Sequence, residues 1–275
     1  MAEIPQPESA RLAVKWFEAQ LGKTLIEIDD LFDKYRLSEA LMAIYKLFWD
    51  EFSAWYLEMA KPAYQQPIDR TTYEATLGFF DSLLKVLHPF MPFITEELWQ
   101  ALEDRKDGES IMLELMPKAV DADEKLIAGV EYAKEIIAGV RAVRLQKNIP
   151  NKELLSLQVI GHHNTGFDAV ITKLGNLESI LSVTDKAAGS VSFLVGTTEF
   201  AISLGSLINV EEEIEKMEAD ILYYEGFLIS VAKKLGNERF VANAKPEVVD
   251  AERKKQADAE SKIASLQEGI EGLRK

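Results

Sequence analysis

The 275-residue sequence contains no cysteine, which excludes disulfides, thiol nucleophiles and zinc sites built from thiolates. An all-histidine metal site would need every one of its histidines, His88, His162 and His163, and adjacent residues on a strand or turn point apart. No apolar run approaches the roughly 18 residues of a membrane helix, and the N-terminus lacks a signal-peptide pattern. We therefore expect a cytoplasmic protein without a metal site or a membrane partner.

The common catalytic signatures are missing as well. The sequence contains no GxxxxGK[ST], GxGxxG, HExxH or GxSxG motif, so no catalytic residue and no cofactor site is predicted. A composition of 47% hydrophobic and 28% charged residues is typical of a folded protein, and the length indicates two or three units. These observations favour a binding or structural protein, or a part of an enzyme without its active site.

Helical periodicity dominates the first half of the chain. Apolar residues recur at helical spacing over residues 7–21, 25–35, 38–59, 70–88, 92–103 and 123–146. The third stretch has Ser38 placed as its N-cap, and its predicted inward stripe is Leu41, Tyr45, Phe48, Phe52, Trp55 and Met59. In the sixth stretch the inward residues are Ile127, Val130, Ala133, Ile137, Val140 and Val143 or Leu145. The short connections between these helices predict an antiparallel bundle over residues 1–148.

Two further units follow the predicted bundle. Short β-rich runs at 154–161, 179–184, 190–195 and 199–204, with a helix at 165–174, predict a small α/β connector over 149–206, whose sheet order stays open. From Leu207 to Leu235, and again from Val249 to Leu273, apolar residues alternate at threes and fours, as in a coiled-coil seam. Two seams joined by a turn predict an antiparallel hairpin over 207–275, with helices of about 40 Å. The expected fold is mainly α.

The net charge of −15 has the wrong sign for a protein that binds phosphates over its whole surface. Positive charge collects in two places: residues 233–255 hold seven cations and four anions, and residues 134–153 hold five cations and two anions. Ordinary solvated faces and phosphate contact are the two interpretations of these clusters. Trp49, Trp55 and Tyr56 could stack on bases, but core packing is the favoured interpretation.

Four sequence runs resemble, in this order, the C-terminal region of valyl-tRNA synthetase, a class I aminoacyl-tRNA synthetase. They are FWDEFSAWYLEMAKP at 48–62, LHPFMPFITEELWQAL at 87–102, VRAVRLQKNIPNKEL at 140–154 and KKLGNERFVANAKPEVVDAERKK at 233–255. The first two runs are shared in looser form by the isoleucyl and leucyl relatives, whereas the last run with its hairpin is specific for the valine enzyme. The resemblance implies an anticodon-binding bundle that lacks its first helix, and a coiled-coil arm that packs against the outer corner of tRNA.

The resemblance also implies a function and its residues. HIGH-type and KMSKS-type signatures are missing, so ATP-dependent aminoacylation is expected in a catalytic domain outside this chain, which would position tRNA(Val) for it. ATP would be a cofactor of the full-length enzyme alone. We expect a monomer that binds tRNA(Val) and no DNA. Contacts at the arm tip would come from Lys233, Lys234, Arg239, Lys245, Arg253, Lys254 and Lys255, and contacts on the anticodon side from Arg141, Arg144 and Lys147.

Two alternatives remain open at this point. One is a helical scaffold that uses its coiled coil to bind itself or a partner chain, an interpretation that the acidic net charge favours. The other is the equivalent region of isoleucyl-tRNA synthetase, which the hairpin and the missing cysteines disfavour.

Overall fold

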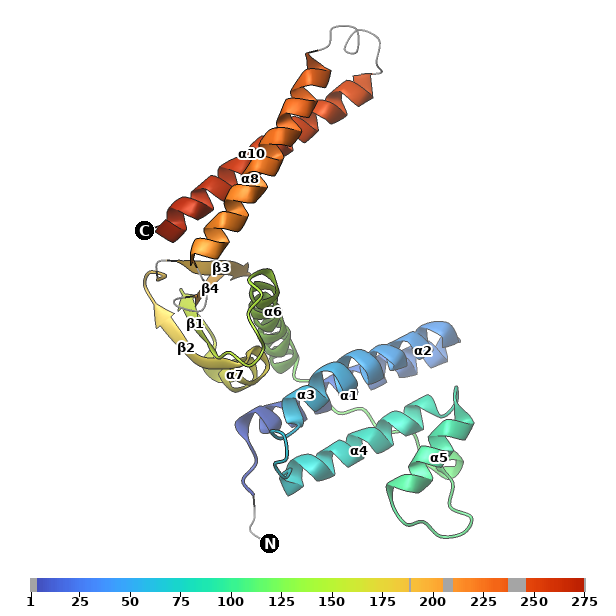
Figure 1. The fold of residues 1–275 in the computed structure, drawn as a ribbon. Coiled ribbons are helices and arrows are strands. Elements are labelled where there is room, and N and C mark those ends of the chain that lie inside the picture. The colour runs from blue at the N-terminus through green and yellow to red at the C-terminus, as the bar shows by residue number, and fades with distance from the viewer. Residues whose placement is uncertain (1–3, 188, 205–209, 237–245, 275) are drawn as a thin grey trace.

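The structure is a computed structural model that describes residues 4–187, 189–204, 210–236 and 246–274 (Figure 1). Its N-terminal part is helical, as the periodicity predicts. The elements are α1 (Glu8–Asp33), α2 (Leu37–Lys46), η1 (Leu47–Tyr56), α3 (Leu57–Ala60), α4 (Arg70–Leu87), α5 (Pro92–Leu102), η2 (Ile111–Leu113) and α6 (Glu124–Gln146). The first two predicted helices are in fact one, α1. Gly22 does not break it; a Cβ there would lie 2.4 Å from the Val120 carbonyl oxygen, so this glycine allows a close backbone approach.

The inward face predicted for residues 38–59 is wrong in its first half. Ser38 is not the N-cap, because the helix starts at Leu37 behind Arg36. Leu41 and Tyr45 are exposed. The buried series is Ala40, Ile44, Leu47, Phe52, Tyr56 and Met59, so the prediction is confirmed for Phe52 and Met59. The five-residue step in the middle of this series falls in η1, a π-helix with i→i+5 hydrogen bonds, which rotates the later residues relative to an α-helix.

The remaining bundle helices follow the predicted boundaries closely. The carboxylate of Asp69 caps α4 by accepting the Thr72 backbone N–H at 2.8 Å, a cap that the sequence analysis did not name. On α6, Val143 is buried and Leu145 is 81% exposed, which decides between the two candidates for that inward position. The other predicted inward residues of α6 are all buried. Their core is continuous with that of the bundle.

The middle part is a four-stranded sheet with one helix across it. Its elements are β1 (Leu155–Ile160), η3 (Thr165–Phe167), α7 (Asp168–Gly175), β2 (Leu177–Val183), β3 (Ser190–Val195) and β4 (Thr198–Ser203). The strand order is β2-β1-β4-β3, with β1 and β2 parallel and the other pairs antiparallel. The parallel pair is joined through α7, as such a connection requires. This settles the sheet order that the sequence left open.

Helix α6 belongs to both neighbouring units. It packs on α1 of the bundle and on α7 and β3 of the connector. Two glycines make the second contact possible, because a Cβ on Gly129 or Gly139 would lie 2.1 Å or 2.2 Å from the ring of Phe167 or Phe193. The bundle and connector therefore share one core rather than two separate ones.

The C-terminal part is the predicted antiparallel hairpin. Helices α8 (Val210–Leu235) and α10 (Pro246–Arg274) lie side by side and extend away from the sheet (Figure 1). Their buried apolar residues, Val231, Val249, Ala259 and Ile270, are all at or beside predicted seam positions. At 1.5 Å per residue the helices are about 40 Å long. None of the helices in the described ranges has the length and hydropathy needed to cross a membrane.

Candidate nucleic-acid interface

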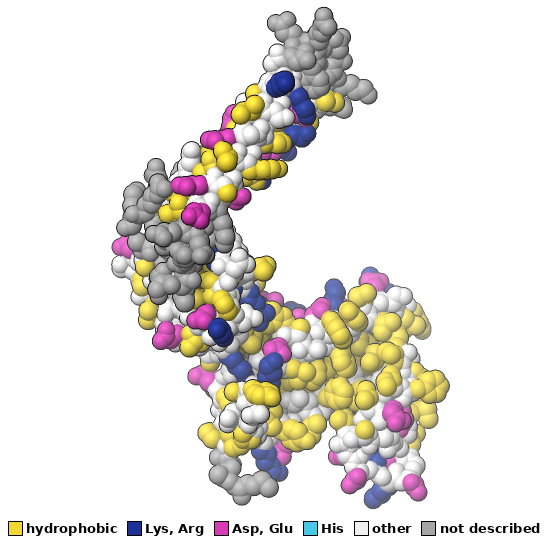
Figure 2. All heavy atoms as spheres, viewed as in Figure 1, with side chains coloured by type: hydrophobic (Ala, Val, Ile, Leu, Met, Phe, Trp, Pro, Cys, Tyr) yellow, Lys and Arg dark blue, Asp and Glu magenta, His cyan; other side chains and the backbone are white. Residues whose placement is uncertain are grey.

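Cations gather toward the outer end of the arm. Lys233 and Lys234 lie in the last turn of α8, and Arg253, Lys254 and Lys255 lie two turns into α10, on the neighbouring helix. Figure 2 shows Lys and Arg side chains at this end of the hairpin. Arg239 and Lys245, which belong to the same predicted set, lie outside the described residues. The fold therefore brings together cations that are about twenty residues apart in the sequence.

Glu252 engages two of these cations. Its side chain is 8% exposed; Oε1 accepts a hydrogen bond from Lys255 Nζ at 2.8 Å, and Oε2 lies 3.6 Å from Lys234 Nζ. The hydrogen bond from Lys255 holds the pKa of the Glu252 carboxyl below its usual range. Part of the positive charge of Lys234 and Lys255 is thus neutralised inside the arm.

The other tip cations are more accessible. Arg253 pairs with Asp250 at 3.4 Å, but both side chains are exposed, and such a pair is weak in water. Lys233 and Lys254 are exposed and have no carboxylate partner within the described part of the chain. These three cations are the ones best placed to meet a phosphate backbone.

The second predicted cluster does not form one cationic surface. Arg144 is 5% exposed and donates hydrogen bonds to the carbonyl oxygens of Pro150 at 3.2 Å, Gly175 at 3.1 Å and Asn176 at 2.8 Å. Burial lowers the pKa of this guanidinium from its usual value. The assignment of Arg144 to the tRNA contacts is therefore withdrawn, because its donors are used inside the protein.

Arg141 remains as an exposed cation of this cluster. Its guanidinium lies 5.7 Å from the ring centre of Trp55. Arg141 also lines a small hollow of about 220 Å³ at the C-terminal end of α6, together with Asn148 and Asn151. Lys147, just after the end of α6, is half-buried. The Trp55 ring itself is partly buried and packs against the core, which confirms the core-packing interpretation for this residue.

Lys134, which adds to the positive count of residues 134–153, is also internal. Its ammonium group lies 2.6 Å from both the Glu51 and the Glu131 carboxylates, and 4.6 Å from the ring centre of Trp16. The side chain is 9% exposed. Lys134 therefore joins α6 to η1 rather than facing a ligand.

Two of the aromatic residues that could stack on bases or pack in the core, Tyr56 and Trp49, differ in their environment. Tyr56 is fully buried and stacks on Phe52 at 5.3 Å, which confirms core packing. For Trp49 the core interpretation is wrong, since its side chain is 61% exposed and stacks on Tyr45 at 6.4 Å. The rotation at η1 accounts for this exposure.

Two of the three histidines, His88 and His163, make local side-chain contacts. His163 Nε2 lies 2.5 Å from the Asp168 carboxylate, and His88 Nδ1 lies 2.7 Å from the Thr95 hydroxyl. Within the described ranges, no group of three or more His, Asp or Glu side chains is arranged to hold a metal ion.

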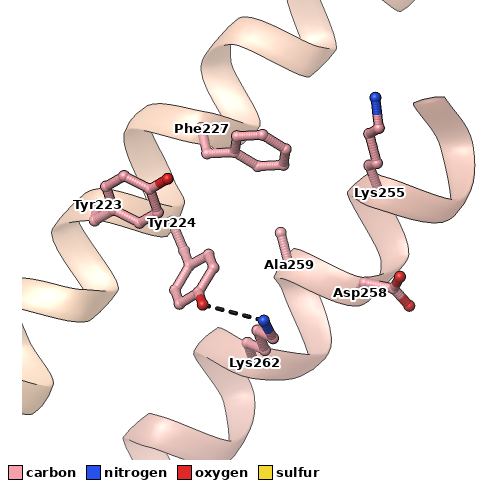
Figure 3. A pocket seen from close by; sticks show the side chains of 7 residues that line it. All are labelled: Tyr223, Tyr224, Phe227, Lys255, Asp258, Ala259 and Lys262. Carbon is pink, nitrogen blue, oxygen red and sulfur yellow. Dashed lines mark hydrogen bonds between the residues drawn. The ribbon is translucent and has the colours of Figure 1, made fainter.

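The arm also contains a pocket that the sequence patterns did not indicate. Tyr223, Phe227 and Lys262 line a hollow between α8 and α10 (Figure 3). The sequence pattern that could have indicated this pocket is the pair Tyr223 and Phe227, four residues apart beside the seam. This spacing places both rings on one face of the helix.

Comparison with known families agrees with this architecture. A sequence model described as the anticodon-binding domain of tRNA ligase matches residues 14–159, which cover most of the bundle and most of β1. The chain therefore belongs to the family of tRNA ligases that carry this domain. A second model, described as the valyl-tRNA synthetase tRNA-binding arm, matches residues 209–274.

The individual relatives that match the chain are named valine-tRNA ligases. The chain is 64% identical to a valine-tRNA ligase of Parabacteroides distasonis over 99% of its length, and 64% identical to that of Phocaeicola vulgatus over its whole length. A valine-tRNA ligase of Porphyromonas gingivalis is 56% identical over 98% of the chain. The chain spans about a third of the length of these curated relatives, 31%, 32% and 31% respectively.

Proposed function

We propose that this chain is the tRNA-binding part of a valine-tRNA ligase. It holds tRNA(Val) through the bundle and the arm, so that the 3′ end of the tRNA reaches a catalytic domain outside this chain, where ATP-dependent aminoacylation takes place. The chain acts as a monomer in the cytoplasm, with RNA rather than DNA or a membrane as its partner. Its contribution to catalysis is positioning.

The observation that carries this proposal is the cationic end of the arm. In a chain of net charge −15, Lys233, Arg253 and Lys254 are exposed together at one end of a hairpin that matches a tRNA-binding arm. Phosphate contacts of this kind fix the position of a nucleic acid without reading its sequence. The names of the relatives favour tRNA(Val) over the scaffold interpretation and over an isoleucyl relative.

We further propose that the chain is organised as residues 1–148, 149–206 and 207–275. The first unit faces the anticodon arm, with Arg141 as its leading cation and Lys147 beside it. The connector, residues 149–206, sets the direction of the arm, residues 207–275. The contact of α6 with α1, α7 and β3 supports a rigid link between the first two units.

Charge reversal at the tip tests the proposal. Arg253→Glu combined with Lys254→Glu should weaken binding of a tRNA(Val) transcript and reduce the slope of log K against log salt by about 1.5, since roughly two phosphate contacts are lost. The measurement is fluorescence anisotropy between about 50 and 200 mM salt.

A matched control separates a local contact from overall charge. Arg11→Glu combined with Lys15→Glu makes the same change in net charge on exposed residues of α1. This control should keep the wild-type slope. An unchanged slope in the tip variant, or an equal loss in the control, would remove the tip from the interface.

A further inference from the structure

A pocket of about 320 Å³ lies between the two helices of the arm (Figure 3). Aromatic rings of α8 form one wall, lysines of α10 lie at the opposite side, and a small side chain forms the floor between them. These residues are Tyr223, Tyr224, Phe227, Lys255, Lys262 and Ala259. The volume is at the small end of the range for ligand pockets.

The hollow arises from a small residue in the helix–helix contact. Ala259 is 3% exposed and has only a methyl side chain, so the facing helix has little to pack against at this level. Tyr224 does not fill the space, because its hydroxyl accepts a hydrogen bond from Lys262 Nζ at 3.1 Å. Its ring lies 5.0 Å from the same nitrogen. Tyr224 and Lys262 thus contact each other at the border of the pocket.

The aromatic wall faces solvent. Tyr223 is 68% exposed, and its ring meets that of Tyr224 edge-on, with centroids 5.4 Å apart. Phe227 is four residues further along α8, so it lies on the same face. An exposed tyrosine and a half-exposed phenylalanine next to an open space provide surfaces on which a flat ring could stack.

Two lysines and one aspartate line the pocket, which gives its lining a net charge of +1, and Lys255 is also paired with Glu252. Lys255 and Lys262 are seven residues apart on α10, so they lie on one face of the helix about 10 Å apart along its axis. Lys255 directly follows the tip cations Arg253 and Lys254. Asp258 also borders the pocket, but its carboxylate points away from the aromatic rings in Figure 3. The contact with the Tyr224 hydroxyl raises the pKa of Lys262, so its ammonium group stays charged.

We propose that this pocket binds one unstacked nucleotide of the RNA held by the arm. The base would stack on Tyr223 and Phe227, and Lys255 and Lys262 would contact the phosphates on either side. Aromatic side chains combined with lysines are the usual means of binding unpaired nucleotides without strict sequence preference. The inference rests on the proposed function, but it adds a stacking contact distinct from the phosphate contacts of the tip.

Substitutions in the full 275-residue chain test the pocket, with a fluorescent tRNA(Val) transcript as the probe. Tyr223→Ala and Phe227→Ala should each weaken binding by at least about fivefold, as expected for the loss of one stacking ring. The slope of log K against log salt should stay unchanged, because no phosphate contact is removed. Tyr223→Phe keeps the ring and should bind like the wild type.

Leu222→Ala is the matched control, because Leu222 is 70% exposed beside Tyr223 and does not line the pocket. Circular dichroism would verify that each variant stays helical, and the exposed Tyr223 provides the decisive variant if Phe227→Ala unfolds the arm. Equal tRNA affinities of the Tyr223→Ala and Leu222→Ala variants would overturn the proposal that the pocket binds a nucleotide. A loss of self-association in Tyr223→Ala without a change in RNA affinity would identify a protein contact and also overturn it.

The binding results distinguish a failure of the pocket proposal from a failure of the proposed function. If the wild type binds tRNA and only the Arg253 and Lys254 reversal weakens it, the pocket is wrong and the proposed function stands. If the wild type does not bind tRNA even at low salt, the proposed function is wrong and the pocket proposal fails with it.

Discussion

The guanidinium of Arg144 donates a hydrogen bond of 2.8 Å to the backbone carbonyl oxygen of Asn176, 32 residues further along the chain. Asn176 is the left-handed C-cap residue of α7, and its side-chain amide donates to the carbonyl oxygens of Asn151 and Glu153. This contact joins the end of α6 to the junction between α7 and β2. It fixes the bundle and the connector at the point where their cores meet.

Arg144→Met should therefore destabilise the protein without removing an RNA contact. The substitution leaves the carbonyls of Pro150, Gly175 and Asn176 without this donor, and we expect a loss of about 2–3 kcal/mol in the free energy of unfolding. Urea unfolding measures this loss. Arg141→Met is the control, and it should unfold almost like the wild type while binding tRNA more weakly. The opposite pattern would show that Arg144 is the contact residue.

Replacement of Gly139 and of Gly78 by alanine should change the stability of the protein in opposite directions. In Gly139→Ala the new Cβ would lie 2.2 Å from the ring of Phe193, which itself stacks on Phe200 at 5.6 Å. The clash should cost about 1–3 kcal/mol. Gly78→Ala on α4 has no heavy atom within 4 Å of the new Cβ and should stabilise by about 0.5–1 kcal/mol. Thermal unfolding of both variants checks the contact of α6 with the sheet, and a stabilised Gly139→Ala would contradict it.

Glu96 should make the stability of the loop after α5 depend on pH. Its carboxylate accepts hydrogen bonds from Gln100 at 2.8 Å, from the Ser110 hydroxyl at 2.7 Å and from the Ile111 backbone N–H at 3.1 Å. The bond from Gln100, followed by that from Ser110, lowers the pKa of Glu96. Because the folded-state pKa is depressed, the contribution is complete above the ordinary glutamate value of about 4.3 and is lost as the pH falls through the folded-state value.

Glu96→Gln should thus cost about 0.5–1 kcal/mol near pH 7, where the site is partly screened by solvent, and progressively less as the pH falls through the folded-state pKa of Glu96. Urea unfolding at several pH values measures the difference from the wild type. Glu97→Gln changes the neighbouring exposed carboxylate and should have no such effect. A pH-independent difference for Glu96→Gln would show that the charge is not what holds the loop.

The sequence predicted the elements of the fold well because each has a strong local signal. Apolar periodicity located α4, α5 and α6, and two seams joined by a turn predicted the arm. The exposure of Trp49 was not predictable in this way, because it depends on the i→i+5 turns of η1. These turns have no recognisable residue pattern in the sequence. The sheet order depended on pairings between distant strands.

For the candidate site, residue type and spacing predicted the cations of the arm but not their environment. Arg144 and Arg141 are three residues apart on one helix, yet one is buried against distant carbonyl groups and the other is exposed. That difference comes from the packing of α7 against α6, which lies outside any local window. The arm pocket was missed for a similar reason, since it depends on which residues of α8 face Ala259.

The most direct test of the central claim is a titration of this chain with tRNA(Val) and with a non-cognate tRNA at low and moderate salt. Our account predicts binding to tRNA(Val) that weakens steeply as salt rises, with a preference for the cognate tRNA contributed by the bundle. Failure to bind either tRNA at low salt would contradict the account.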